Sequence, residues 1–344
     1  MNATVPSSGF YLDRLLEPLA PFLGRPDITD IFINRPGEDW IEALAGPIER
    51  VAIPELGDRE LQRLARLVAA QTHQAVSSAH PLLAATLPDG SRIQVVLPPA
   101  TRGGISVSIR RHVVSDLRVA DYEQAGAFPD SAMGQDGSDG ATTLVDLRER
   151  GQFGELLTLA VRQCRNILVS GGTSSGKTTF LNALLQEIPC DERLVLIEDT
   201  PELRLRHDNA VGLIAVRGDQ GEARVSADDL LTASLRMRPD RIILGELRGP
   251  EAFTFIRAVN TGHPGSMTTI HADSPDRAVE QLAMLVLQRG VELRRADIHD
   301  YVRSVVDVFV QLERGPKGRR VSEVRLGQHV VEAAAAAAAR GAAA

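Results

Sequence analysis

Cysteines and long apolar runs are scarce in this sequence. Its 344 residues include only two cysteines, Cys164 and Cys190, which cannot build a four-cysteine zinc site. This low cysteine content favours a reduced, cytoplasmic protein. No apolar run approaches the roughly 18 residues of a membrane span, and the N-terminus lacks a basic region followed by an apolar one. We therefore expect a cytoplasmic protein whose association with a membrane is peripheral and made through partners.

The sequence also lacks an excess of basic residues. A net charge of -7 at pH 7 gives no general basic field for nucleic acid, and aromatic residues for base stacking make up only 4%. We expect no direct binding of nucleic acid. The net charge is still compatible with a cluster of basic residues on one face of the protein. The remaining composition, 43% hydrophobic and 24% charged, is typical of a globular protein, and the length predicts two or three domains.

One glycine-rich segment carries the clearest chemical signal. The stretch NILVSGGTSSGKTT matches the phosphate-binding pattern G-x-x-x-x-G-K-[ST], with a strand pattern before it and a helical pattern behind it. Lys177 is predicted to reach the β and γ oxygens of a nucleotide, and the Thr178 hydroxyl to ligate Mg²⁺. The expected nucleotide-binding residues of this loop are Gly171, Gly172, Thr173, Ser174, Ser175, Gly176, Lys177, Thr178 and Thr179.

Acids and a histidine follow other predicted strands. Glu198 and Asp199 follow one apolar strand, Glu246 follows a second, and His271 closes a third. Because the carboxyl ends of parallel strands share one edge with a P-loop, these side chains are expected to face the phosphates. Glu246 is predicted to activate water, with Glu198 and Asp199 in the metal shell or orienting water. His271 either contacts the γ-phosphate or Glu246, or is a structural histidine.

Four regions differ in their pattern. Residues 1–120 predict an α+β domain with a half-exposed antiparallel sheet. Gly, Asp, Ser and Ala dominate much of residues 121–150, which we expect to be a flexible linker. Strands then alternate with helices over residues 151–330, as in an α/β domain with a mainly parallel sheet. Residues 331–344 form an alanine-rich, low-complexity tail that we expect to be frayed or weakly helical, and to which we assign no function.

Four sequence blocks occur together in a characteristic order. They are GGTSSGKTT, LIEDTPEL, RMRPDRIILGELRGPEAF and NTGHPGSMTTIHADSP. Together they resemble the Walker A, Asp box, Walker B and His box of the secretion traffic ATPases, and within them of the hexameric ATPases of type IV secretion systems. DITDIFINRPGEDWIE, DGSRIQVVLPPA and SVSIRR near the start, and VRSVVDVFVQLER near the end, extend the resemblance over nearly the whole chain.

The resemblance implies a homo-hexameric ring whose subunits hold ATP between an N-terminal domain and a RecA-like P-loop domain. It makes Lys177 and Thr178 the phosphate and Mg²⁺ ligands, Glu198 the Asp-box acid, Glu246 the catalytic glutamate and His271 the His-box histidine. The Walker B strand ends in Gly-Glu with no Asp directly before the glutamate, which shifts the metal shell towards Thr178 and Asp199.

Members of the family also direct N-terminal arginines at the phosphates, and Arg92 and Arg110 match these. The alternation of the strand around Arg110 independently places this arginine on the polar side and Arg111 on the apolar side. The arginines would therefore report whether the γ-phosphate is present.

The sequence thus predicts a Mg²⁺-dependent ATPase that drives machine assembly or substrate transfer in type IV secretion or conjugative transfer by ATP-driven domain motion. It would act at the cytoplasmic face of the inner membrane, on inner-membrane components of the apparatus. An ATPase of pilus assembly or type II secretion is the alternative, although the four-cysteine zinc insert of many such enzymes cannot form here. A RecA-like nucleic-acid motor and a non-hydrolysing scaffold are more distant alternatives.

Overall fold

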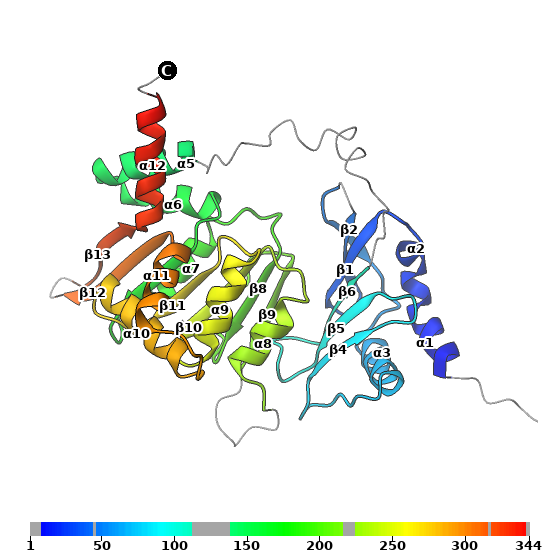
Figure 1. Cartoon of the computed structure of the whole chain (residues 1–344). Helices are drawn as coiled ribbons and strands as arrows, with labels where there is room; N and C mark the ends of the chain where they lie inside the picture. Colours follow the sequence, from blue (N-terminus) through cyan, green and yellow to red (C-terminus); the bar gives the residue numbers. More distant parts are fainter. Residues whose placement is uncertain (1–7, 44–45, 112–137, 216–223, 316–317, 342–344) are drawn as a thin grey trace, which may run out of the picture.

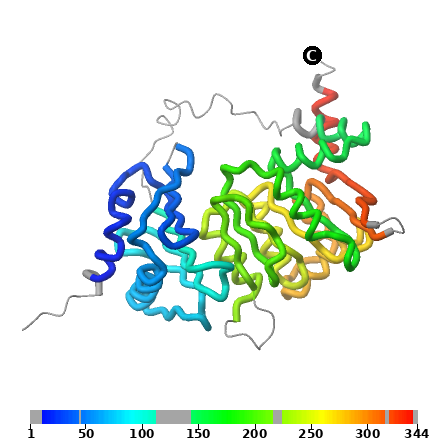
Figure 2. Tube along the Cα trace, turned by 180° about the vertical axis from the view of Figure 1, so that it is seen from behind, coloured from blue at the N-terminus to red at the C-terminus, as the bar shows by residue number. Residues whose placement is uncertain are grey.

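Two sheets organise the molecule. The computed structural model describes residues 8–43, 46–111, 138–215, 224–315 and 318–341. A six-stranded sheet belongs to the N-terminal half and a seven-stranded sheet to the C-terminal half, and Figures 1 and 2 show the two halves side by side. The predicted α/β class, with a mainly parallel sheet preceded by a smaller α+β part, is confirmed.

The N-terminal sheet is antiparallel throughout, in the order β3-β2-β1-β6-β5-β4. Its strands are β1 (Ile28–Arg35), β2 (Glu38–Ala43), β3 (Glu49–Ala52), β4 (Leu82–Thr86), β5 (Arg92–Val96) and β6 (Ser106–Arg110). Its helical segments are α1 (Ser8–Leu16), the 3₁₀ turn η1 (Glu17–Leu19), α2 (Ala20–Leu23) and α3 (Asp58–Gln71). Apolar residues of α3 pack with those of β1, β5 and β6 in one core, because alternate strand residues point to the helix-covered face.

The C-terminal sheet has the order β13-β12-β7-β11-β10-β8-β9 and is parallel except between β12 and β13. Its strands are β7 (Ile167–Gly171), β8 (Leu194–Glu198), β9 (Ala210–Ile214), β10 (Arg241–Leu247), β11 (Met267–Ile270), β12 (Val308–Gly315) and β13 (Gly318–Leu326). The helices are α5 (Ser138–Glu149), α6 (Phe153–Arg162), α7 (Lys177–Leu185), α8 (Ala227–Ser234), α9 (Glu251–Asn260), α10 (Pro275–Leu287), α11 (Arg295–Val305) and α12 (Gln328–Gly341).

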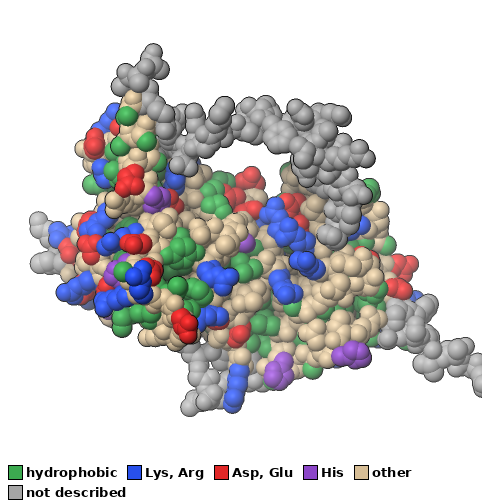
Figure 3. Space-filling view, in the orientation of Figure 1, with side chains coloured by type: hydrophobic (Ala, Val, Ile, Leu, Met, Phe, Trp, Pro, Cys, Tyr) green, Lys and Arg blue, Asp and Glu red, His purple; other side chains and the backbone are tan. Residues whose placement is uncertain are grey.

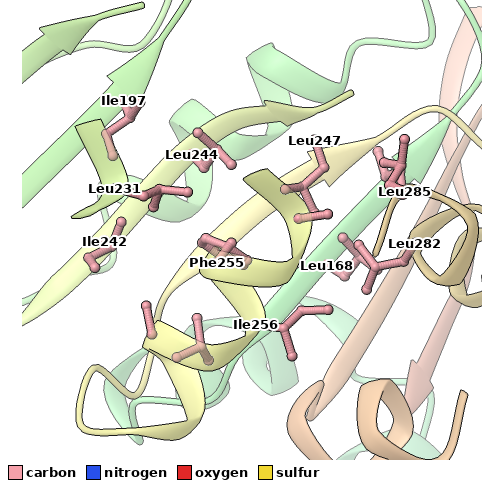
Figure 4. Packing of buried hydrophobic residues seen from close by; sticks show 14 of the residues in the cluster. Leu168, Ile197, Leu231, Ile242, Leu244, Leu247, Phe255, Ile256, Leu282 and Leu285 are labelled. Carbon is pink, nitrogen blue, oxygen red and sulfur yellow. The ribbon is translucent and has the colours of Figure 1, made fainter. Parts of the chain in front are cut away.

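Both faces of this sheet are covered by helices, which explains its near-continuous apolar strands. Leu168 and Leu244 point to the face on which Phe255 and Leu282 of α9 and α10 pack, as Figure 4 shows. The neighbouring strand residues point the other way, into a second core with α6 and α7. The strands are held between these two layers, which fixes the edge where their carboxyl ends meet.

The polar face of the N-terminal sheet is not half-exposed, as the sequence predicted, but buried against the C-terminal half. Ser106 and Ser108 are buried, and Arg193 of the C-terminal half is fully buried against this face. Arg193 donates from Nη1 to Asn34 Oδ1 at 2.8 Å and from Nη2 to Ser108 Oγ at 3.3 Å, and its guanidinium lies 3.9 Å from the ring centroid of Phe32. Burial lowers the pKa of Arg193 to about 9, so the two halves share a charged buried contact at neutral pH.

Part of the expected flexible linker and most of the tail expected to be frayed or weakly helical are packed helices. Residues 121–137 of the expected linker lie outside the described residues, but residues 138–149 form α5. This helix packs against α12, which contains the alanine run, and Leu144 of α5 and Val330 and Ala334 of α12 are buried. Alanine has the highest helix propensity, and its small side chain allows helices to approach closely.

A buried acid makes the stability of the N-terminal half depend on pH. Asp39 on β2 is fully buried, and within the described residues neither of its carboxylate oxygens has a hydrogen-bond partner. Burial, with a smaller contribution from Glu38, raises the pKa of Asp39 from 3.8 to about 7. The folded state therefore holds a proton that the unfolded state releases between these two values.

We expect the stabilisation from this proton to be complete below pH 4 and lost as pH rises to 7 and above. The native protein should lose on the order of 4 kcal/mol relative to Asp39→Asn across this window, because asparagine cannot ionise. Urea unfolding of both proteins at pH 4 and pH 8 measures the difference. A free-energy difference between them that does not change with pH would contradict this assignment.

Candidate active site

A cavity of about 570 Å³ lies at the carboxyl edge of the parallel sheet, between the P-loop and the ends of β8, β10 and β11. It contains the predicted acids and histidine together with most of the predicted loop. Its lining residues are Thr173, Ser174, Ser175, Gly176, Lys177, Thr178, Thr179, Glu198, Asp199, Thr200, Glu202, Gly245, Glu246, Arg248, Thr269, His271 and Arg319.

The P-loop joins β7 to α7 in a turn that needs glycine. Gly176 has φ +95°, and a β-carbon on Gly171 would lie 2.8 Å from the carbonyl oxygen of Leu312. Lys177 is the first residue of α7, and its Nζ donates to the carbonyl oxygens of Gly171 at 2.9 Å and Gly172 at 3.3 Å. The loop thus holds its own lysine ammonium over the place where backbone amides and the helix N-terminus favour an anion.

Glu246 near the end of β10 lies between two cations. Its Oε1 is 3.6 Å from Lys177 Nζ, and its carboxylate pairs with Arg248. Arg248 also lies 3.5 Å from Asp199, measured from Nη1 to Oδ2. Arg248 thus bridges two of the acids. Negatively and positively charged side chains therefore alternate beside the P-loop.

Glu198, the last residue of β8, has its carboxylate occupied by protein groups. Oε1 accepts hydrogen bonds from the backbone amides of Glu202 at 3.0 Å and Leu203 at 2.7 Å. The other oxygen pairs with Arg102 of the N-terminal half, and the residue is only 5% exposed. In this arrangement Glu198 ties together the turn that carries Asp199 and Thr200.

His271 follows β11 and lines the cavity, as expected from its place at the strand end. The neighbouring Thr269 donates from its hydroxyl to the carbonyl oxygen of Gly245 at 2.8 Å, which links β11 to β10 beside Glu246. The predicted shared edge therefore brings Lys177, Glu246 and His271 into one cavity.

The two N-terminal arginines lie elsewhere. Arg92 and Arg110 face each other on β5 and β6, and neither is among the described residues that line the P-loop cavity. Arg110 Nε is 3.9 Å from Asp30 Oδ1, and Arg110 lines another cavity of about 610 Å³ with Arg238 and His263. Figure 3 shows basic side chains gathered near the junction of the two halves. Within one chain, the structure does not bring these arginines to the phosphates.

Two other arginines at the site were not predicted from the sequence. Arg319 on β13 lines the cavity and donates from Nε to the carbonyl oxygen of Ser174 at 3.0 Å. Arg319 reaches the P-loop because β13 pairs with β12, and β12 is hydrogen-bonded to β7. The second arginine is Arg102, which pairs with Glu198. No local sequence pattern places β12 and β13 beside β7.

Comparisons with known proteins agree with this geometry. Residues 144–340 match the family of type II/IV secretion system proteins. The chain is 42% identical over 319 residues to VirB11 of Brucella suis biovar 1, covering 90% of this chain and 88% of that protein. It is 39% identical over 324 residues to the type IV secretion system protein PtlH of Bordetella pertussis, and the match covers 91% of this chain and 94% of PtlH.

A solved structure extends the agreement to the fold. The crystal structure of the VirB11 ATPase from the Brucella suis type IV secretion system, in complex with sulphate, superposes with a TM-score of 0.86 at 41% identity. The superposition covers 93% of this chain and 98% of the Brucella suis chain. The predicted secretion ATPase is therefore confirmed: the chain belongs to the type II/IV secretion system protein family and is a VirB11-type ATPase of type IV secretion.

Proposed function

We propose that the P-loop cavity binds Mg²⁺-ATP and that Glu246 activates the attacking water. The observation that carries this assignment is the 3.6 Å separation of Lys177 Nζ and Glu246 Oε1 inside one cavity. A base placed beside the lysine that would hold the γ-phosphate is within reach of a water in line with that phosphate. Lys177 would exchange its two loop carbonyl oxygens for phosphate oxygens when the nucleotide binds.

The side chains available for a metal suit Mg²⁺ as an ATP-bound ion. Within the described residues there is no group of three or more His, Cys, Asp or Glu side chains that could hold a metal on their own. The Thr178 hydroxyl and the Asp199 carboxylate both line the cavity and offer oxygen ligands. Mg²⁺ is commonly bound by one or two protein oxygens, with substrate phosphates and waters completing the shell. Bound there, it would neutralise charge on the β- and γ-phosphates.

The remaining site residues have supporting roles in this proposal. His271 would hydrogen-bond the γ-phosphate or Glu246, because it lies at the same edge of the sheet. Arg248 would leave Glu246 for the phosphates or for Asp199, its second partner. The loop residues Thr173–Thr179 would wrap the phosphates with their backbone amides.

We further propose a homo-hexamer with an N-terminal domain over residues 1–120, a linker and a RecA-like domain over residues 151–330. Arg92 and Arg110 could meet phosphates in such a ring if they came from a neighbouring subunit, since they lie away from the cavity of their own chain. The ring would act at the cytoplasmic face of the inner membrane through inner-membrane components of the apparatus. None of the described helices is both long enough and apolar enough to span a membrane.

Magnesium dependence tests this assignment. We expect ATP turnover to stop when EDTA removes Mg²⁺, and Thr178→Ala to raise the Mg²⁺ concentration for half-maximal turnover about tenfold, because one oxygen ligand is lost. Phosphate release measured over a Mg²⁺ titration at fixed ATP gives this concentration. Thr261→Ala is the matched control, because among the described residues that hydroxyl bonds to carbonyl oxygens of the helix that it caps, α9. Full turnover in EDTA would contradict the assignment.

A further inference from the structure

A loop of the N-terminal half extends the C-terminal sheet. Thr101, between β5 and β6, forms an antiparallel bridge with Leu213 of β9. The amide of Arg102 donates to the carbonyl oxygen of Gly212 at 3.0 Å, and the amide of Ile214 donates to that of Ala100 at 2.9 Å. In Figure 1 this cyan loop lies beside β9. The backbone of Arg102 is therefore fixed in register with the sheet that carries the nucleotide site.

The side chain of Arg102 crosses β9 and ends at the Asp box. A β-carbon on Gly212 would lie only 2.5 Å from Arg102 Cδ, so glycine makes room for the crossing. Arg102 Nη1 donates to the carbonyl oxygen of Leu203 at 2.6 Å, and Nη2 pairs with the Glu198 carboxylate. The two side chains are 15% and 3% exposed. The pair is thus a largely buried charge contact between the two halves.

Glu198 transmits this contact to the cavity. Its Oε1 accepts from the amides of Glu202 and Leu203, so the turn from residue 198 to 203 closes around one carboxylate. Asp199 and Thr200 in this turn line the cavity, and Asp199 contacts Arg248, the partner of Glu246. A displacement of Glu198 would therefore move groups that face the nucleotide.

We propose that Arg102 is a positioning residue that holds the Asp-box turn in its catalytic arrangement, and so makes ATP hydrolysis depend on the contact of the β5–β6 loop with β9 and the Asp box. The proposal rests on the proposed function of the P-loop cavity. Removing one partner of a buried ion pair leaves an uncompensated charge, which the turn relieves by moving. A misplacement of about 1 Å in groups around a reacting phosphate lowers the rate strongly while substrate contacts elsewhere persist.

A second ion pair between the halves provides a matched control. Arg238 of the C-terminal half contacts Glu42 of β2, with Nη2 and Oε1 2.5 Å apart. Arg238 lines the other cavity, with Arg110, and neither Arg238 nor Glu42 lines the P-loop cavity among the described residues. Glu42→Gln therefore weakens docking of the halves without touching the Asp box.

Steady-state ATP turnover by the full chain tests the proposal. We expect Arg102→Ala to lower kcat about tenfold while KM for ATP stays within about threefold, and Arg102→Lys to restore part of the loss. The double variant Arg102→Ala with Glu198→Ala should be no slower than the slower single variant, because both substitutions remove the same ion pair. Glu42→Gln should keep kcat within about twofold of the wild type.

Three outcomes would overturn the proposal: an unchanged kcat for Arg102→Ala, losses that multiply in the double variant, or an equal loss in Glu42→Gln. The last would mean that any weakening of the docked halves slows turnover. Failure of the proposed function gives a different result, because Glu246→Gln would then hydrolyse ATP at the wild-type rate.

Discussion

Glu246→Gln is expected to lower ATP turnover by about 100-fold or more while ATP still binds with an affinity within about threefold of the wild type. Glutamine keeps the size of the side chain but cannot accept a proton from water. The ion pair lost to Arg248 has a small structural cost, because the Arg248 side chain is 51% exposed and water replaces the carboxylate. Phosphate release and equilibrium binding of ATP measure the two quantities separately.

Glu187→Gln is the matched control for this variant. Glu187 lies in the same half of the molecule, outside the P-loop cavity, with its carboxylate 3.9 Å from Arg162. We expect both its turnover and its ATP affinity to equal those of the wild type. Wild-type turnover in Glu246→Gln would mean that another group activates water.

Lys177→Ala is expected to weaken ATP binding about 10- to 100-fold and to remove measurable turnover. A hydrogen bond to a charged group contributes about 1.5–3 kcal/mol, and Lys177 lines the cavity that we propose holds the phosphates. The substitution also removes the cation 3.6 Å from Glu246. Binding of ATP and of ADP should both weaken, because the lysine is placed to reach the β- and γ-phosphates.

Arg162→Ala serves as the control for the loss of a positive charge. Its side chain is 64% exposed, and its partner Glu187 lies at 3.9 Å, so the charge contributes little. Binding and turnover should be unchanged in this variant. Wild-type ATP affinity in Lys177→Ala would contradict the role assigned to the P-loop.

The sequence was most informative where the site is built from contiguous residues. The P-loop, its strand and its helix follow one another in the chain, so a local pattern predicts their arrangement. Because the carboxyl ends of parallel strands meet at one edge of the sheet, Glu246 and His271 were predicted to lie beside the P-loop, and both line its cavity. These predictions need only the order and direction of the strands.

Contacts between the two halves could not be predicted in this way. Arg102 meets Glu198 because the β5–β6 loop docks on β9, and nothing in the local pattern around either residue specifies that docking. The serines of β6 alternate as on a solvated face, yet both are buried, and Arg193 supplies a polar partner to Ser108. Arg110 remains exposed at the border of the same face.

The alanine run was also underestimated. Low complexity indicated a frayed or weakly helical tail, but a packed partner converts weak helix formation into a stable helix. In α12 that partner is α5, which begins inside the segment that composition assigned to a linker. Composition describes a segment alone, whereas its structure here depends on the neighbour it packs against.

The most direct test of the account is the fate of ATP bound in a single turnover by wild type and Glu246→Gln, each mixed with less than one equivalent of Mg²⁺-ATP and quenched in acid. We predict that the wild type converts its bound ATP to ADP, while Glu246→Gln still holds ATP at times about 100-fold longer. Formation of ADP at the same rate in both proteins would contradict the assignment of Glu246 and, with it, the proposed active site.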